Sequence, residues 1–133
     1  MCCKKIRICF LVVFFGLFMA FSANAAKNIA SIAVAANDPG PEATVSEKAG
    51  RAAYFLFFDG SGNFLDAERN PFAGIPGGAG PKAAVFLSDK GVALVVAGEF
   101  GTKMERALSS YKIKYILQTG AAHEVVQAIT KEK

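Results

Sequence analysis

The segment with the clearest potential for binding chemistry is a glycine-rich loop, residues 70–80, whose last part, residues 74–80, leads into a helix predicted to begin at Pro81. Successive backbone N–H groups and the positive end of a helix dipole can face one anion in such a loop, and Lys82 follows closely. We therefore predict an anion site here, with a plain flexible connector as the alternative. The spacing is neither that of a P-loop nor that of a dinucleotide fingerprint. The contributing glycines would be Gly77, Gly78 and Gly80.

A second loop, with Gly98 and Gly101, follows a predicted buried strand. Ligands of open α/β sheets bind beyond the carboxyl ends of such strands. Arg51 is the charged residue of greatest interest because a guanidinium can hold a carboxylate or phosphate with two hydrogen bonds, although a structural ion pair explains it equally well. If residues 46–51 and the two loops meet at one edge of the sheet, they form the ligand site.

Residues for catalysis or metal binding are sparse. His123 has no evident partner, so we expect it to be exposed and structural rather than a metal ligand. Asp59 begins a stretch with the spacing of a calcium loop, but the sixth position is Phe64 and the twelfth is not Glu, which favours a hairpin turn. Asp66 and Glu68 lie on the same polar hairpin, where solvated carboxylates are common. We therefore predict that the protein is not an enzyme.

The elements that must position these residues alternate between strands and helices. The first strand is short, apolar and partly β-branched, so it should be central and buried on both faces. The second and third flank Gly-Ser-Gly-Asn and form a hairpin. One helical turn is expected in the polar stretch that ends at Arg51. The predicted strands are 29–35, 53–59, 64–69, 92–97 and 113–117, and the predicted helices are 81–90, one beginning at Thr102 and one beginning at Ala122.

The helix at Thr102 has its own start signal. Thr102 and Glu105 have the T-x-x-E spacing of a capping box, which predicts that the two side chains satisfy each other's backbone N–H groups. Met104, Leu108 and Tyr111 recur at helical spacing, so Met104 should belong to the core rather than act as a ligand.

The order of these elements predicts an α/β fold. Strands that alternate with helices in the second half imply right-handed crossovers and a parallel sheet, and the hairpin adds one antiparallel strand. We expect one domain, residues 26–133, because about 108 residues can build a single core.

The first 25 residues have the pattern of a secretory signal peptide. Lys4, Lys5 and Arg7 precede an apolar run that is too short for a membrane span of about 20 residues, and small residues follow near Ala25. We predict cleavage after about Ala25, export to the periplasm or medium, and no stable membrane span afterwards.

Removal of this segment changes the composition. All three cysteines leave with it, and 12 basic residues then face 11 acidic ones, so the formal charge falls from +4 to +1. No basic cluster of the kind that binds nucleic acid remains. His123 is the only soft ligand besides methionine in residues 26–133.

Four segments, in register, resemble the dinitrogenase iron-molybdenum cofactor biosynthesis family, which includes the NifX and NafY carriers and the C-terminal domain of NifB. They are Val45–Phe55, Asn70–Pro71, Gly77–Ala83 and Ala97–Gly101. The resemblance implies a ribonuclease-H-like three-layer fold with a mixed five-stranded sheet. It also implies binding of an iron–sulfur or iron–molybdenum cluster, and a link to nitrogen fixation. Lys48 stands where many relatives have a histidine.

Two functions remain open from the sequence. The first is an exported, non-enzymatic carrier that binds a small ligand or metallocluster at the loop edge of the sheet. The second is a protein-interaction module that keeps the fold without the cofactor site, as the lack of soft ligands allows. A hydrolase of phosphate esters is a weaker third class, which would depend on Asp59.

Overall fold

A computed structural model describes residues 30–132, so the predicted signal peptide, residues 1–25, lies outside the described part of the chain. Within this part, strand β1 (Ile32–Ala36) is buried along its whole length and is the middle strand of the sheet. Its small and β-branched apolar side chains pack against helices on both faces, as the sequence predicted.

The sheet has five strands in the order β3-β2-β1-β4-β5. The pairs β1–β2 and β2–β3 are antiparallel, whereas β1–β4 and β4–β5 are parallel. Strand β2 therefore runs against the other four, which confirms a mixed sheet with one antiparallel strand. The remaining strands are β2 (Tyr54–Phe58), β3 (Phe64–Arg69), β4 (Leu94–Ala97) and β5 (Lys114–Leu117).

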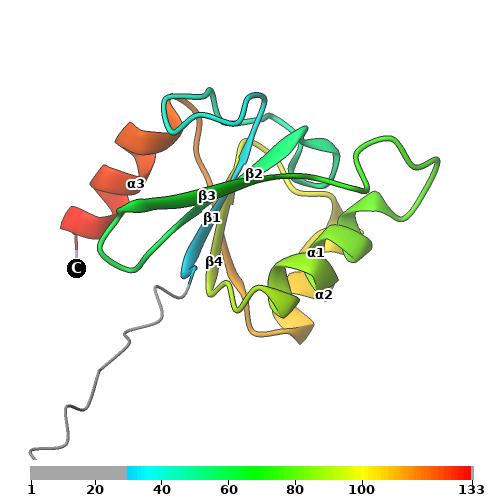
Figure 1. The fold of residues 1–133 in the computed structure, drawn as a ribbon. Coiled ribbons are helices and arrows are strands. Elements are labelled where there is room, and N and C mark those ends of the chain that lie inside the picture. Colours follow the sequence, from blue (N-terminus) through cyan, green and yellow to red (C-terminus); the bar gives the residue numbers. More distant parts are fainter. Residues whose placement is uncertain (1–29, 133) are drawn as a thin grey trace, which may run out of the picture.

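Helices cover both faces of the sheet (Figure 1). Helices α1 (Ala79–Asp89) and α2 (Thr102–Ser110) lie on one face, and α3 (Ala122–Lys131) lies on the other. The expected helical turn before the hairpin is the short 3-10 helix η1 (Ala49–Arg51). The described residues thus form three layers, with helices outside and the sheet between them.

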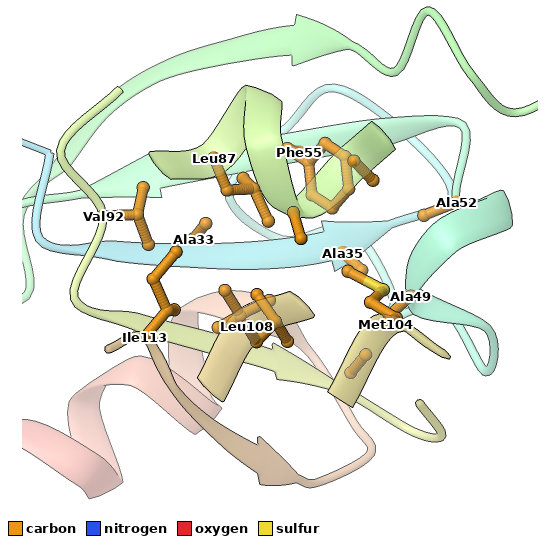
Figure 2. Close-up of a cluster of buried hydrophobic side chains, with 14 of the residues drawn as sticks. Ala33, Ala35, Ala49, Ala52, Phe55, Leu87, Val92, Met104, Leu108 and Ile113 are labelled. Atoms are coloured by element: carbon orange, nitrogen blue, oxygen red, sulfur yellow. The ribbon is translucent and has the colours of Figure 1, made fainter. Parts of the chain in front are cut away.

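Each face of the sheet has its own core. The larger one fills the space between the sheet and helices α1 and α2, and Figure 2 shows Leu87 of α1 and Leu108 of α2 directed at the sheet. Met104 is 1% exposed and belongs to this core, as predicted. The smaller core includes Val126 of α3 and lies on the other face.

The predicted start of α1 and the predicted N-cap of α2 were wrong. Helix α1 begins at Ala79, two residues before Pro81, so Gly80 is helical rather than part of the loop. A proline fits there because N–H groups of a first turn have no intrahelical acceptor. Helix α2 has Gly101 as its N-cap, and no side chain caps it. The Glu105 N–H donates to the Gly101 carbonyl (2.9 Å), which moves Thr102 into the helix and rules out the capping box.

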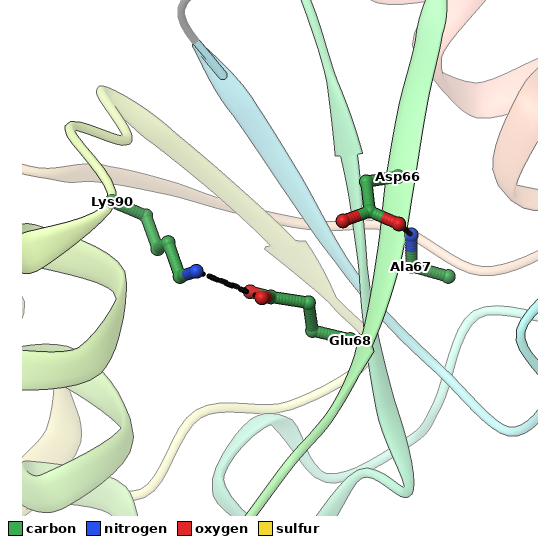
Figure 3. Close-up of polar contacts among 4 residues, drawn as sticks. All are labelled: Asp66, Ala67, Glu68 and Lys90. Atoms are coloured by element: carbon green, nitrogen blue, oxygen red, sulfur yellow. Dashed lines mark hydrogen bonds and ion pairs between the residues drawn. The ribbon is translucent and has the colours of Figure 1, made fainter.

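Polar contacts join the hairpin to the helical layer. The Lys90 ammonium group, at the end of α1, donates to Glu68 Oε1 of β3 at 2.8 Å, and Asp66 Oδ1 accepts the Ala67 N–H (Figure 3). His123 differs from the expectation of full exposure, because it is half-buried and its backbone N–H donates to the Pro41 carbonyl.

Candidate ligand-binding site

A cavity of about 400 Å³ lies where the turn η1 meets the first residues of α1 and α2. These are the three segments that the sequence analysis placed at one edge of the sheet, so their expected convergence is confirmed. We name this space the helix-start cavity. Its lining comprises Lys48–Arg51, Gly78–Pro81, Glu99 and Gly101–Met104.

Backbone hydrogen bonds hold the η1 segment beside the carboxyl ends of β1 and β4. The Ser46 N–H donates to the Ala35 carbonyl (2.7 Å), and the Gly98 N–H donates to the Ser46 carbonyl (2.9 Å). The Ala49 N–H then donates to the Glu99 carbonyl (3.1 Å). One wall of the cavity is therefore built onto the strand ends, where open α/β sheets bind their ligands.

Glycines allow the three segments to touch. A Cβ atom on Gly50 would lie 2.8 Å from the Gly80 Cα, and one on Gly80 would lie 2.8 Å from the Met104 Cβ. A Cβ on Gly98 would lie 3.0 Å from the Glu47 Cα. Gly80 and Gly98, predicted as ligand contacts, thus have a packing role, because a side chain at either position would push backbones apart.

Two helix N-termini border the cavity. The N-cap residues are Gly78 for α1 and Gly101 for α2, and neither helix has a side-chain cap. The N–H groups of a first turn carry the positive end of the helix dipole and lack intrahelical acceptors. Gly78 has a φ of +72°, a left-handed conformation that favours glycine. First-turn residues of both helices are therefore part of the cavity lining.

The charged side chains of the lining have a positive excess. Lys48, Arg51 and Lys103 are basic, and Glu99 is the single acidic residue among the lining positions. Lys48 and Arg51 also line a neighbouring polar cavity of about 390 Å³. The arrangement favours an anion, because the basic side chains and the helix dipoles act in the same direction.

Arg51 has a structural partner as well. Its Nη1 donates to the Ala73 carbonyl (3.2 Å) and to the Ile75 carbonyl, and both belong to the glycine-rich loop. The residue predicted as an anion clamp therefore also fastens this loop to η1. This contact joins positions 22 and 24 residues apart, so no local sequence pattern signals it.

The predicted site residues divide into two groups. Arg51, Gly78, Gly80 and Gly101 line the cavity. Gly77, Lys82 and Gly98 are not part of its lining, and Lys82 is exposed on α1. Lys103 was missed by the sequence analysis. Its position directly after Thr102, in the first turn of the predicted helix, was the available signal.

The cavity lacks the donor set of a thiolate-ligated or imidazole-ligated metal. Its lining contains neither Cys nor His, and the Met104 side chain is packed near Ala49 in the core (Figure 2). Across residues 30–132, no three His, Cys, Asp or Glu side chains are grouped so that they could hold a metal ion. The lining therefore offers backbone groups of two helix starts and basic side chains rather than thiolate or imidazole ligands.

The carboxylates considered for catalysis are separately engaged. Asp59 accepts hydrogen bonds from the N–H groups of Asn63 and Ser61 (both 2.9 Å), and those from Asn63 are the main reason that its pKa is lowered. This geometry confirms the predicted hairpin turn. Asp66 accepts the Ala67 N–H and Glu68 pairs with Lys90 (Figure 3), so the three carboxylates do not share a metal site.

Comparisons with known proteins give a consistent result. The model of the family described as dinitrogenase iron-molybdenum cofactor matches residues 28–132. The apo orange protein from Desulfovibrio gigas is 28% identical, with a TM-score of 0.73 over 78% of this chain and 89% of that chain. A Thermotoga protein provisionally described as a NifB protein of the DUF35 family is 28% identical, with a TM-score of 0.65 over 77% and 88% of the two chains. No curated protein sequence matches this chain.

No helix within residues 30–132 is long and apolar enough to cross a membrane.

Proposed function

Because the chain belongs to the dinitrogenase iron-molybdenum cofactor family, we propose that it is a non-enzymatic binding protein for an anionic, sulfide-rich metal cluster. The cluster is cargo in this proposal, not a resident catalytic group. The observation that carries it is the helix-start cavity, where two uncapped helix N-termini and three basic side chains surround one space. Sulfide-bridged clusters carry negative charge, so this environment attracts them.

The residues that line the cavity can attract a cluster by charge, but they cannot ligate its metal atoms. Protein iron–sulfur clusters are held by cysteine thiolates, and the lining of the cavity has none. A cluster bound here would keep its own sulfide or organic ligands and accept hydrogen bonds from the backbone. Such a complex exchanges readily, which suits a carrier better than an enzyme.

The test uses tetrathiomolybdate, a coloured dianion of molybdenum and sulfide, in an absorption titration with the purified protein. Lys48→Gln and Lys103→Gln should each weaken binding about thirtyfold, because a unit charge 4 Å from a dianion in water is worth about 2 kcal/mol. Lys131→Gln, at the end of α3, is the matched control and should bind like wild type. Added salt should weaken binding by wild type. Equal affinities for the three variants would place the site elsewhere.

The interaction-module hypothesis is favoured by one observation, the lack of Cys and His around the cavity. It predicts that the purified protein binds neither tetrathiomolybdate nor a cluster assembled from ferrous iron and sulfide under anaerobic conditions. A coloured, metal-containing protein isolated directly from its host would exclude it.

We also propose that the protein is exported after cleavage near Ala25, on the support of the basic, apolar and small-residue pattern of residues 1–25. Mass spectrometry of the protein isolated from its host should give a chain that starts at about Ala26. A full-length chain in the cytoplasm would contradict this proposal.

For the architecture, we propose the ribonuclease-H-like class. The strand order β3-β2-β1-β4-β5 with β2 antiparallel supports it, as does the placement of α1 and α2 opposite α3 (Figure 1). A shared fold implies no nuclease chemistry, because function depends on the site rather than on the fold.

A further inference from the structure

Asn70 is a buried polar residue next to the helix-start cavity but not in its lining. It directly follows β3 and is 3% exposed. A buried amide must find hydrogen-bond partners or destabilise the fold, so its contacts show what it does.

The Asn70 side chain joins two separate segments. Its Nδ2 donates to the Gly50 carbonyl (3.1 Å) and to the Ala52 carbonyl (2.9 Å), both in or next to η1. Its Oδ1 accepts the Phe72 N–H (3.0 Å), at the start of the glycine-rich loop. An amide is the group required, because the two carbonyls need donors and the N–H needs an acceptor.

These contacts act on two walls of the cavity. One wall is η1, and Gly50 of that wall rests directly on Gly80 of α1. The other is the start of α1, which the glycine-rich loop reaches through Gly78. Arg51 fastens the same loop farther along, at the Ala73 carbonyl. The loop is therefore held to η1 at its start by Asn70 and near its middle by Arg51.

We propose that Asn70 is a positioning residue that holds η1 to the start of the glycine-rich loop, and so helps to set the shape of the helix-start cavity. The importance of that shape for a ligand rests on the proposed function. The positioning itself does not, because it follows from two side-chain atoms of Asn70 and their three backbone partners.

The experiment compares Asn70→Asp and Asn70→Ser with Val126→Ala in the full-length protein. Asp has the shape of Asn, but at neutral pH its carboxylate cannot donate to two carbonyls. Ser is included as a smaller, neutral substitution that keeps the test possible if the buried carboxylate of Asn70→Asp prevents folding. Val126 is buried in the core on the opposite face of the sheet, so Val126→Ala is the control for a general loss of stability. All are measured where at least nine-tenths of the protein is folded.

The first measurement is amide hydrogen exchange by mass spectrometry. We expect Asn70 variants to exchange at least tenfold faster in residues 49–52 and 71–80 while β1 and β4 stay protected. Val126→Ala should show no such local increase. Unchanged exchange in both segments, or an equal increase in Val126→Ala, would overturn the proposal.

The second measurement is the tetrathiomolybdate titration. We expect at least tenfold weaker binding by the Asn70 variants and less than a twofold change in Val126→Ala. Wild-type affinity in an Asn70 variant would overturn the link between positioning and binding. If wild type itself binds no probe, the proposed function fails, and hydrogen exchange alone still decides the positioning role.

Discussion

Substitution of Gly80 by Ala tests the tight contact on which the cavity is built. The added Cβ would lie 2.8 Å from the Met104 Cβ and 3.5 Å from its Cγ, whereas ordinary contacts begin at 3.4 Å. Helices α1 and α2 would have to separate by about 0.6 Å, because both Cβ atoms are fixed to helical backbone.

The expected loss of stability follows from two opposing effects. Overpacking a close contact costs about 1–3 kcal/mol. Replacing Gly by Ala in a helix raises the free energy of unfolding by up to about 1 kcal/mol, and by less in a first turn. We therefore expect Gly80→Ala to lower the free energy of unfolding by about 1–2 kcal/mol, measured by urea titration with far-ultraviolet circular dichroism.

Gly77→Ala, three residues earlier and before the start of α1, is the matched control. No atom lies within 4 Å of a Cβ at Gly77, so the change should stay within about 0.5 kcal/mol. A stable Gly80→Ala protein would refute the argument, since it would mean that the two helices are not in close contact there. Equal losses in both variants would refute it too, because the contact would not be the cause.

Two further predictions concern the hairpin. Hydrogen bonds, chiefly from Asn63, lower the pKa of Asp59, so its carboxylate stabilises the fold above the ordinary Asp pKa, and this contribution disappears as pH falls through the lowered value. Asp59→Ala should thus reduce the urea midpoint at pH 7 and approach wild type near pH 2; a gap that does not depend on pH would contradict this. For the Lys90–Glu68 pair, with side chains 39% and 33% exposed, a double-mutant cycle with Lys90→Met and Glu68→Gln should give a coupling below about 1 kcal/mol that weakens in 1 M salt. A coupling above about 2 kcal/mol would show that solvent does not screen the pair.

Features of the fold that arise from local pattern were predicted well. The hairpin was expected at 53–59 and 64–69, and the strands are Tyr54–Phe58 and Phe64–Arg69. The glycines and Asn63 favour a tight turn, and the apolar residues that flank them favour strands. The prediction that β1 is central was also correct, because a short strand with no polar residue buries both of its faces only in the middle of a sheet.

The starts of α1 and α2 were less predictable, since several signals compete there. A proline can occupy any position in the first turn of a helix, so Pro81 marks the start of α1 only to within a few residues. At α2, the T-x-x-E pattern indicated Thr102 as the N-cap, whereas the structure uses Gly101 and Thr102 is the first helical residue.

The sequence by itself determined the α/β class, the order of the elements and the three segments that meet at the helix-start cavity, because these depend on periodicity and on turn residues close together in the chain. Only the tertiary structure decided what individual residues do there. Gly80 proved to be a helix contact with Met104, Arg51 a fastener of the glycine-rich loop, and Asn70 the link between that loop and η1. Most of these contacts join positions 18 to 24 residues apart, and their distances depend on how the layers pack rather than on any local propensity.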